Sequence, residues 1–285
     1  MKNYSNEGLI FLPDFKLFDY EEWSQLLEKR VGITIPRERE LFLQTKIWSR
    51  MRELGISSFS EYWQMIKNGI TGNLEWSELL DRLTVHETSF FRHGPSYKLV
   101  QEDFKNILEN KTKFHYKVWS VSCSTGEEPY SLAMMLHELK SKVEKDSIYY
   151  GITATDVSKP ALIQAENCFY SKEKVKEIDL KYRKYLTSVN SNIFTIDETI
   201  KNRVAFGVFN LLKIEKMPTI KFDIIFCHNV LIYFSKGKKI KILEGLKRFL
   251  KKGGLLVLNP TDIGSWKSQG MTRITYKRTL AYKLD

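Results

Sequence analysis

Residues 122–136 read SCSTGEEPYSLAMML, an apolar strand pattern that runs into a tight turn and then into a helical pattern. In many α/β proteins a glycine-rich turn at a helix N-terminus holds a nucleotide phosphate. This turn contains one glycine, Gly126, and the carboxylates of Glu127 and Glu128 follow it at once. Because negative side chains repel a phosphate, the turn favours a ligand of different charge.

Length and composition limit the kind of protein. The chain has 285 residues, which suits one large domain or a domain of about 200 residues with a smaller one. Its 42% hydrophobic and 13% aromatic residues suffice for a packed core. No apolar stretch approaches the roughly 20 residues of a membrane span, and the first residues contain no secretion signal. We expect a cytoplasmic protein without membrane insertion.

The net charge of +11 predicts attraction to something acidic. Nucleic acid, an anionic membrane surface and an acidic protein all have the required charge, and composition does not choose among them. The three cysteines lack metal-ligand spacing, so we expect buried free thiols and no metal site.

The first part of the chain shows four helical patterns. Asp19 is suited to cap the first helix, and Pro36 to begin the second. Apolar residues at helical spacing continue over residues 58–67 and 75–83. We predict a small all-helical domain over residues 1–85.

From about Lys117 the pattern changes, because apolar runs now alternate with helical patterns. Continuous apolar strands separated by helices indicate a parallel sheet that is covered on both faces. The tail MTRITYKRTLAYKL has the alternation of an antiparallel hairpin, and a polar stretch between Tyr170 and Arg203 reads as an insertion. We predict an α/β domain over residues 86–285.

Polar residues follow four of the predicted strands, where an open parallel sheet binds its ligands. They are Ser124–Glu128, Asp156, Asn210–Leu211 and His228–Asn229, with Tyr233 shortly after the last pair. This convergence is more specific than any one motif.

The ligand's two ends are indicated separately. Asp156 fits hydrogen bonds to both hydroxyls of an adenosine ribose, although a plain turn residue is an equal alternative. S-adenosylmethionine combines adenosine with a sulfonium and an α-ammonium, so carboxylates attract it. The alternative for Glu127 and Glu128 is stabilisation of a helix start, which we favour for Glu127.

The stretch TSFFR, residues 88–92, lies at the junction of the two predicted domains. By itself it reads as core phenylalanines followed by a surface charge. Ligand clefts also form at such junctions, and an arginine can hold a carboxylate in bidentate fashion.

With these motifs the chain resembles the CheR-type chemotaxis-receptor glutamate O-methyltransferases, which esterify glutamate side chains on chemoreceptors. The resemblance runs from about Phe18 over nearly the whole chain, and STGEEPYS and NVLIYF together with TSFFR are highly specific to that family. It implies a Rossmann-like class I methyltransferase domain preceded by the helical domain, with a small β-subdomain inserted near residues 180–205. The implied cofactor is S-adenosylmethionine, with S-adenosylhomocysteine as product, and the implied partners are acidic methylation helices of chemoreceptors.

The resemblance assigns candidate cofactor contacts at His86, Thr88, Arg92, Glu127, Glu128, Asp156, Asn210, Leu211, His228 and Asn229. It places Asp156 at the ribose, Glu128 at the methionine portion and Tyr233 beside the methyl group. Arg92 and Tyr233 are the expected catalytic residues, since the first can orient the acceptor carboxylate and the second can shape the methyl pocket.

Two places depart from the family pattern. His86 stands where asparagine is usual, and Asn259-Pro260-Thr261-Asp262 replaces glycine-histidine-serine-glutamate after the last core strand. Because that loop flanks the mouth of the implied active site, we expect it to affect substrate choice.

A glutamate carboxylate, with a pKa of about 4.3, is ionised at neutral pH and needs no general base to accept a methyl group. Alignment and removal of water are then the enzyme's tasks. The second predicted helix has five cations that suit an acidic receptor helix: Arg37, Arg39, Lys46, Arg50 and Arg52. The short insertion lacks a glycine-rich loop, so we expect direct recognition of the substrate helix without a peptide tether.

Two alternatives stay open. A methyltransferase of the same fold acting on RNA or DNA would suit the charge, although the sequence shows no aromatic stacking platform, and we expect no stable nucleic-acid partner. A catalytically altered family member could instead bind cofactor or receptor as a regulator, which His86 and the Asn259-Pro260 pair leave possible.

Overall fold

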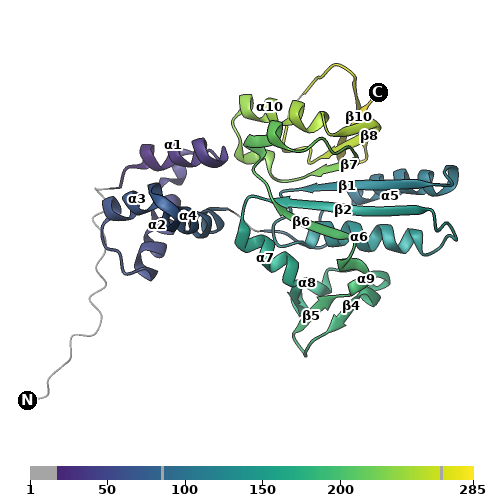
Figure 1. The fold of residues 1–285 in the computed structure, drawn as a ribbon, viewed down its shortest axis with the longest axis horizontal. Helices are drawn as coiled ribbons and strands as arrows, with labels where there is room; N and C mark the ends of the chain where they lie inside the picture. Colours follow the sequence, from purple (N-terminus) through teal and green to yellow (C-terminus); the bar gives the residue numbers. More distant parts are fainter. Residues whose placement is uncertain (1–17, 85–86, 264–265) are drawn as a thin grey trace, which may run out of the picture. The chain divides into compact units, whose positions relative to one another are not determined.

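The computed structural model describes residues 18–84, 87–263 and 266–285. The chain forms two compact units, a helical unit that contains α1 to α4 and an α/β unit that runs from α5 onward and includes Val31–Ile33 (Figure 1). Among the described helices, none has both the length and the apolar character needed to cross a bilayer.

The helical unit is built from α1 (Tyr20–Val31), α2 (Glu40–Glu53), α3 (Phe59–Lys67) and α4 (Gly69–Leu83), with a 3-10 turn, η2 (Arg37–Arg39), before α2. Asp19 caps α1 by accepting a hydrogen bond from the backbone N–H of Glu22 at 3.0 Å, as predicted. Trp23 packs edge-on against Trp63 with ring centroids 4.7 Å apart, and its ring is 2% exposed. The aromatic residues therefore form the centre of this unit.

Helix α4 begins at Gly69, whereas the helical pattern was recognisable in the sequence only from Glu75. Two glycines in the first turn have low helix propensity, so local preference does not predict this start. Packing accounts for it, because a Cβ on Gly72 would lie 2.3 Å from the backbone oxygen of Met65 in α3. Only glycine permits this close approach of the two helices.

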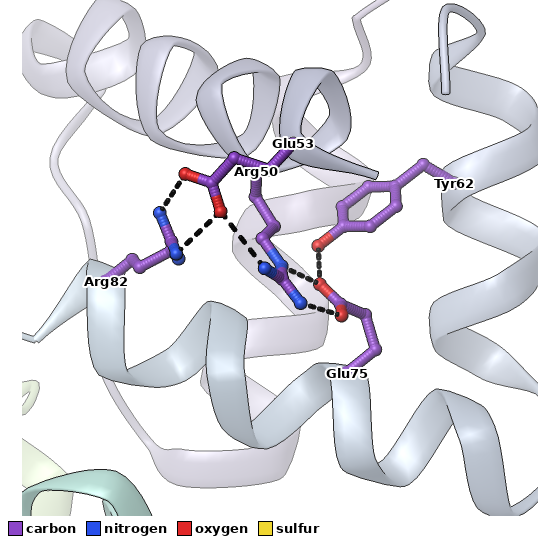
Figure 2. Close-up of polar contacts among 5 residues, drawn as sticks. All are labelled: Arg50, Glu53, Tyr62, Glu75 and Arg82. Atoms are coloured by element: carbon purple, nitrogen blue, oxygen red, sulfur yellow. Dashed lines mark hydrogen bonds and ion pairs between the residues drawn. The ribbon is translucent and has the colours of Figure 1, made fainter. Parts of the chain in front are cut away.

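A partly buried ionic network joins α2, α3 and α4 (Figure 2). The guanidinium of Arg50 donates two hydrogen bonds of 2.8 Å to the carboxylate of Glu75, which also accepts one from the Tyr62 hydroxyl at 2.7 Å. Glu53 contacts Arg50 at 3.1 Å and accepts two hydrogen bonds of 2.8 Å from Arg82. Burial and the Glu75 carboxylate both raise the pKa of Tyr62, so its hydroxyl keeps its proton and remains a donor.

The α/β unit is organised around a seven-stranded sheet of order β6-β2-β1-β7-β8-β10-β9. Its strands are β1 (Phe114–Val121), β2 (Ile148–Asp156), β6 (Val204–Val208), β7 (Phe222–Cys227), β8 (Leu250–Leu258), β9 (Met271–Tyr276) and β10 (Thr279–Leu284). The pairs from β6 to β8 are parallel, and β10 is antiparallel to both β8 and β9. The predicted Rossmann-like fold with its antiparallel C-terminal hairpin is confirmed.

Helices cover both faces of this sheet. They are α5 (Gly94–Asn110), α6 (Glu127–Lys140), α7 (Lys159–Asn167), α9 (Glu198–Lys201) and α10 (Lys236–Lys247), with the 3-10 turns η4 (Leu211–Lys216) and η5 (Leu231–Tyr233). Val118 and Ile224 pack with α5 and α6, whereas their neighbours Trp119 and Ile225 pack with η4 and α10. The two-residue alternation of each strand thus supplies two separate cores.

The insertion is a three-stranded antiparallel sheet of order β3-β5-β4. It comprises β3 (Phe169–Ser171), α8 (Lys172–Lys176), η3 (Leu180–Tyr185), β4 (Leu186–Ser188) and β5 (Ile193–Ile196). In Figure 1, β4 and β5 lie below the main sheet. The small sheet begins at β3, before the start near residue 180 that the sequence predicted. The prediction missed β3 because three residues are too few to form a recognisable strand pattern.

Candidate methyl-transfer site

The turn between β1 and α6 is tightly wound. Ser122, Ser124 and Gly126 have φ values of 61°, 50° and 95°, all in the left-handed region. A Cβ on Gly126 would lie 2.9 Å from both the Cβ of Ala165 and the hydroxyl of Tyr170, so this position requires glycine on conformational and steric grounds. The turn is therefore built to approach α7 and β3 closely.

Asp156, at the end of β2, fixes this turn from the neighbouring strand. One carboxylate oxygen accepts hydrogen bonds from the Ser124 backbone N–H at 2.8 Å and the Ser122 hydroxyl at 3.3 Å. The other oxygen accepts from the Ser158 backbone N–H at 2.9 Å. The side chain thus acts as a turn residue, and the second oxygen retains a lone pair that a ribose hydroxyl can use.

The two adjacent glutamates have different environments. Glu127 is 0% exposed; its carboxylate is paired with Lys174 of α8 and accepts a hydrogen bond from the Thr125 hydroxyl at 2.7 Å. Both carboxylate oxygens are thus occupied within the protein. Its environment is that of a structural anchor, which leaves Glu128 as the glutamate available to a ligand.

Glu128 is partly exposed and accepts a hydrogen bond from the Ser120 hydroxyl at 2.7 Å. Burial of the carboxyl group raises its pKa from an ordinary 4.5 to about 8, although the Ser120 hydrogen bond and the charge of Arg92 act in the opposite direction. A carboxyl group in this condition is stabilised as an anion by an incoming cation. Ser120, a small polar residue in the buried second half of β1, could have indicated this partner in the sequence.

The TSFFR stretch is fastened to α6. Ser131 accepts a hydrogen bond from the Phe91 backbone N–H at 3.0 Å and donates one to the Glu127 backbone oxygen at 2.6 Å. Phe90 packs edge-on against Tyr170, and Phe91 stacks on Tyr182 with ring centroids 4.6 Å apart. The two phenylalanines are therefore packing residues that join this stretch to the insertion.

Arg92 and Thr88 come next to this packed pair. The Arg92 side chain is exposed and donates a hydrogen bond to the backbone oxygen of Glu87, while Thr88 is partly buried. The positive charge of Arg92 lowers the pKa of both Glu128 and His228. The neighbours of Arg92 in the chain are tied to both places, since Phe91 donates to Ser131 of α6 and His93 is joined through Ser96 to His228 after β7. His86, the remaining candidate from this stretch, lies outside the described residues.

His228, directly after β7, belongs to a buried polar network that the sequence did not reveal. Its Nε2 lies 3.1 Å from the Ser96 hydroxyl, which also lies 2.8 Å from His93 Nδ1 and 3.2 Å from the Thr279 hydroxyl. The ring stacks on Phe226 with centroids 4.4 Å apart. Burial lowers the pKa of His228 to about 3, with help from the charges of His93 and Arg92, so the imidazole is neutral at physiological pH.

Asn229 has a φ of 57° and is held by the loop that departs from the family pattern. Its backbone N–H donates to Asp262 at 3.0 Å, and its side-chain oxygen accepts from the Asn259 side chain at 2.7 Å. Asp262 is 0% exposed, and burial raises its pKa to about 7. This loop therefore fixes both the backbone and the side chain of Asn229.

Three candidates remain at the other strand ends. Asn210 caps η4 by accepting a hydrogen bond from the Leu212 backbone N–H at 3.0 Å, and Leu211 is buried. Tyr233, at the end of η5, is partly buried. Within the described part of the chain, no group of three or more histidine, cysteine or acidic side chains is arranged to hold a metal ion.

These residues fit S-adenosylmethionine. Asp156 can serve a ribose, and Glu128 offers a carboxyl group that no cation of the described protein neutralises directly. The turn that precedes α6 has no lysine or arginine for a pyrophosphate. Fold and site together define a class I methyltransferase.

Comparison with known proteins agrees with this class and also identifies the family within it. The family model described as "CheR methyltransferase, SAM binding domain" matches residues 86–271, and "CheR methyltransferase, all-alpha domain" matches residues 19–84. The chain belongs to the CheR methyltransferase family. It is an S-adenosylmethionine-dependent methyltransferase, and the predicted resemblance is confirmed.

Curated relatives match over most of their length. A chemotaxis protein methyltransferase of Borreliella burgdorferi is 30% identical over 271 residues, covering 90% of this chain and 94% of the relative. Proteins of the same name from Klebsiella aerogenes and Escherichia coli are 31% and 29% identical, covering 82% of this chain and 79% and 80% of their own lengths. The likeness thus includes both units of the chain.

Proposed function

We propose that the protein transfers the methyl group of S-adenosylmethionine to glutamate side chains of chemoreceptors, giving glutamyl methyl esters and S-adenosylhomocysteine. The observation that carries this proposal is the environment of Glu128, a carboxyl group in the first turn of α6 that accepts a hydrogen bond from Ser120 and has no cationic partner among the described residues. Glu128 suits the cationic methionine portion of the cofactor, and the exposed Arg92 suits an incoming carboxylate.

The bound cofactor supplies an activated methyl group on a sulfonium whose leaving group is neutral. The protein then has to place a carboxylate oxygen in line with that methyl group and exclude water. Arg92 orients the carboxylate, and Tyr233 shapes the pocket around the methyl group. Arg92 already donates to the Glu87 backbone oxygen, so part of its hydrogen-bonding capacity is occupied. The remaining N–H groups can still orient the carboxylate, but they do so from a side chain that is already anchored to the backbone.

Replacing Arg92 tests this assignment. We expect Arg92→Ala to lower kcat/KM for methyl-ester formation about 10- to 100-fold, the value of a charge-assisted hydrogen bond. Arg92→Lys keeps the charge and loses the planar fork, so it should retain intermediate activity. The product is measured as base-labile label transferred from S-adenosylmethionine to receptor fragments. Near-normal turnover of Arg92→Ala with unchanged cofactor affinity would exclude the role.

The proposed docking surface for the acidic receptor helix is the outer side of α2, with one correction. Arg50 is not available to a partner, because its Nε and Nη2 donate to Glu75 and its Nη1 contacts Glu53, all inside the helical unit. The Arg50 side chain is only 17% exposed, so an acidic helix could not reach it.

The other four cations remain exposed and lie over aromatic rings: Arg37, Arg39, Lys46 and Arg52. Arg39 and Lys46 lie 5.8 and 5.7 Å from the ring centre of Phe42, and Arg52 lies 5.3 Å from that of Trp48. Stacking on a ring restricts each side chain and reduces the entropy lost when an acidic partner binds. Arg37, which pairs with Glu21, contributes less.

The substrate helix is proposed to bind directly, in the cytoplasm, without a peptide tether on the small sheet. The β4–β5 connection supports this, because it is a short turn in which Asn190 accepts hydrogen bonds of 2.9 Å from the backbone N–H groups of Asn192 and Ile193. Receptor fragments with and without their C-terminal segment should therefore be methylated at similar rates. A large preference for the longer fragment would contradict direct binding.

Family membership does not favour the alternative of a nucleic-acid methyltransferase. Assays of label transfer separate the remaining alternatives. Label in alkali-stable linkage to nucleic acid would support the first alternative. Cofactor binding without any transfer would support a regulator.

A further inference from the structure

Asn229 is held at two points by the segment that follows β8. Its backbone N–H donates to the Oδ2 of Asp262 at 3.0 Å, and its side-chain Oδ1 accepts from the Nδ2 of Asn259 at 2.7 Å. The left-handed φ of 57° at Asn229 is thus maintained by two side chains some 30 residues away. Within the described residues, the Nδ2 of Asn229 has no partner.

The direction of these hydrogen bonds follows from a backbone group. The N–H of Thr261 can only donate, and it donates to the Oδ1 of Asn259 at 3.1 Å. The Thr261 hydroxyl donates to the same oxygen at 3.0 Å. The Nδ2 of Asn259 is therefore the atom that faces Asn229. Because Nδ2 can only donate, Asn229 accepts with its Oδ1. A backbone N–H thereby decides the orientation of a side-chain amide two hydrogen bonds away.

Asp262 accepts the hydrogen bond from the Asn229 backbone N–H, although burying its carboxyl group is energetically unfavourable. It is 0% exposed, and its Oδ1 has no hydrogen-bond partner among the described groups. Lys239 contacts only its backbone oxygen, at 3.0 Å. A buried carboxyl group with one unpaired oxygen destabilises a fold. The backbones of Asn229 and Asn259 both act on its side chain, and the hydrogen bond from the Asn229 N–H is the one that positions Asn229.

We propose that Asn259 and Asp262 are positioning residues that make Asn229 a one-way hydrogen-bond donor to an acceptor oxygen of the ligand in the methyl-transfer site. This inference rests on the proposed function, and Asn229 Nδ2 is the donating atom. The acceptor oxygen belongs either to the cofactor or to the glutamate carboxylate that receives the methyl group. In both cases Asn229 discriminates against a ligand that presents a donor at this point.

Asn259→Asp reverses this polarity. An aspartate accepts from the Thr261 N–H as before but has nothing to donate, so the Asn229 amide turns its Nδ2 toward residue 259 and its Oδ1 toward the ligand. We expect a loss of affinity of about tenfold or more, because two acceptors then face each other. Asn259→Gly removes the directing bond and leaves the amide free to rotate, for which about threefold is expected.

The added charge of Asn259→Asp is controlled by a double-mutant cycle. In an Asn229→Ala background there is no side-chain amide at position 229 to reorient. Adding Asn259→Asp to that background should therefore lower the ligand affinity little further. An equal loss in both backgrounds would overturn the inference, because it would show a plain charge effect. No loss in the otherwise unchanged protein would overturn it as well. Thermal unfolding of each variant establishes that the fold is retained.

Two measurements identify the oxygen that accepts the hydrogen bond from Asn229. Calorimetry with S-adenosylhomocysteine reports a cofactor oxygen, and the KM for receptor fragments at saturating cofactor reports the substrate carboxylate. Asp262→Asn still offers an oxygen to the Asn229 N–H and should keep affinity within about threefold, whereas Asp262→Ala should not. Equal behaviour of these two variants would contradict the role of Asp262. An unchanged protein that binds no S-adenosylhomocysteine would instead refute the proposed function.

Discussion

At the scale of single residues, neighbouring side chains of one type perform different tasks here. Glu127 and Glu128 begin the same helix, yet one is neutralised by Lys174 and the other accepts only the Ser120 hydroxyl. The cationic partner of Glu127 comes from a segment 47 residues further along the chain. Since such pairing depends on tertiary structure, the sequence favoured Glu128 as the contact without revealing why Glu127 is excluded from solvent.

Glu128 gives a pH prediction. Its pKa of about 8 in the folded protein exceeds its ordinary 4.5, so the folded state binds the proton more tightly than the unfolded state. Its contribution to the free energy of unfolding should therefore decrease as the pH rises from about 4.5 to about 8. Binding of a cation requires the ionised form, so affinity for S-adenosylmethionine should rise over the upper part of this range and level off above pH 8.

Calorimetry in two buffers of different ionisation enthalpy measures the proton released on binding. Glu128→Gln should weaken binding and abolish both the proton release and the rise of affinity with pH. Glu144→Gln, at an exposed position between α6 and β2, is the matched control and should change neither. A pH-dependent affinity that persists in Glu128→Gln would assign the effect to another group.

At the scale of elements, the strand ends were predictable and the connections between them were not. Asp156, Asn210 and His228 follow apolar strands whose boundaries the sequence indicates clearly, so the parallel sheet brings them to one edge. The pairing of His228 with Ser96 crosses 132 residues and has no local signal. Short elements such as β3 and the glycine-containing start of α4 also depend on packing more than on local preference.

The ionic network of the helical unit predicts an asymmetry between two glutamates. Glu75 is 7% exposed, and removing it leaves Arg50 partly buried without its bidentate partner. We expect Glu75→Ala to lower the free energy of unfolding of this unit by about 3 kcal/mol. Glu53→Ala, which removes exposed contacts of the same network, should cost less than about 1 kcal/mol.

Denaturation of the full chain followed by tryptophan fluorescence measures both effects, because Trp23, Trp48, Trp63 and Trp76 all lie in this unit. Equal losses for the two variants would show that burial does not govern the strength of the network.

A second element-scale prediction concerns the insertion. Lys174→Met leaves the fully buried Glu127 without its counter-ion and should lower stability by about 2 kcal/mol, since Lys174 itself is partly exposed. The further change Glu127→Gln should recover most of this loss. Lys176→Met, at an exposed position on the same helix, is the control. Thermal unfolding in which the double variant is no more stable than the single one would contradict this account.

At the scale of the whole molecule, the net charge of +11 makes association with an acidic partner dependent on salt. We expect kcat/KM for receptor fragments to fall as ionic strength rises. Lys46→Glu on α2 should lower it about 2- to 10-fold at low salt and less at high salt. Lys67→Glu makes the same charge change on α3 and should have a smaller effect. A salt-insensitive kcat/KM would exclude docking through α2.

The contact between Lys174 and Glu127 also limits how this enzyme can be re-engineered. The small sheet is an attractive module to exchange between relatives, because it lies between α7 and α9 and has its own strand pairing. Any graft would nevertheless have to supply a cation at the position of Lys174. Without it, the buried carboxylate of Glu127 would have no counter-ion in the first turn of α6, and the turn between β1 and α6 would be destabilised although the graft itself leaves that turn unchanged.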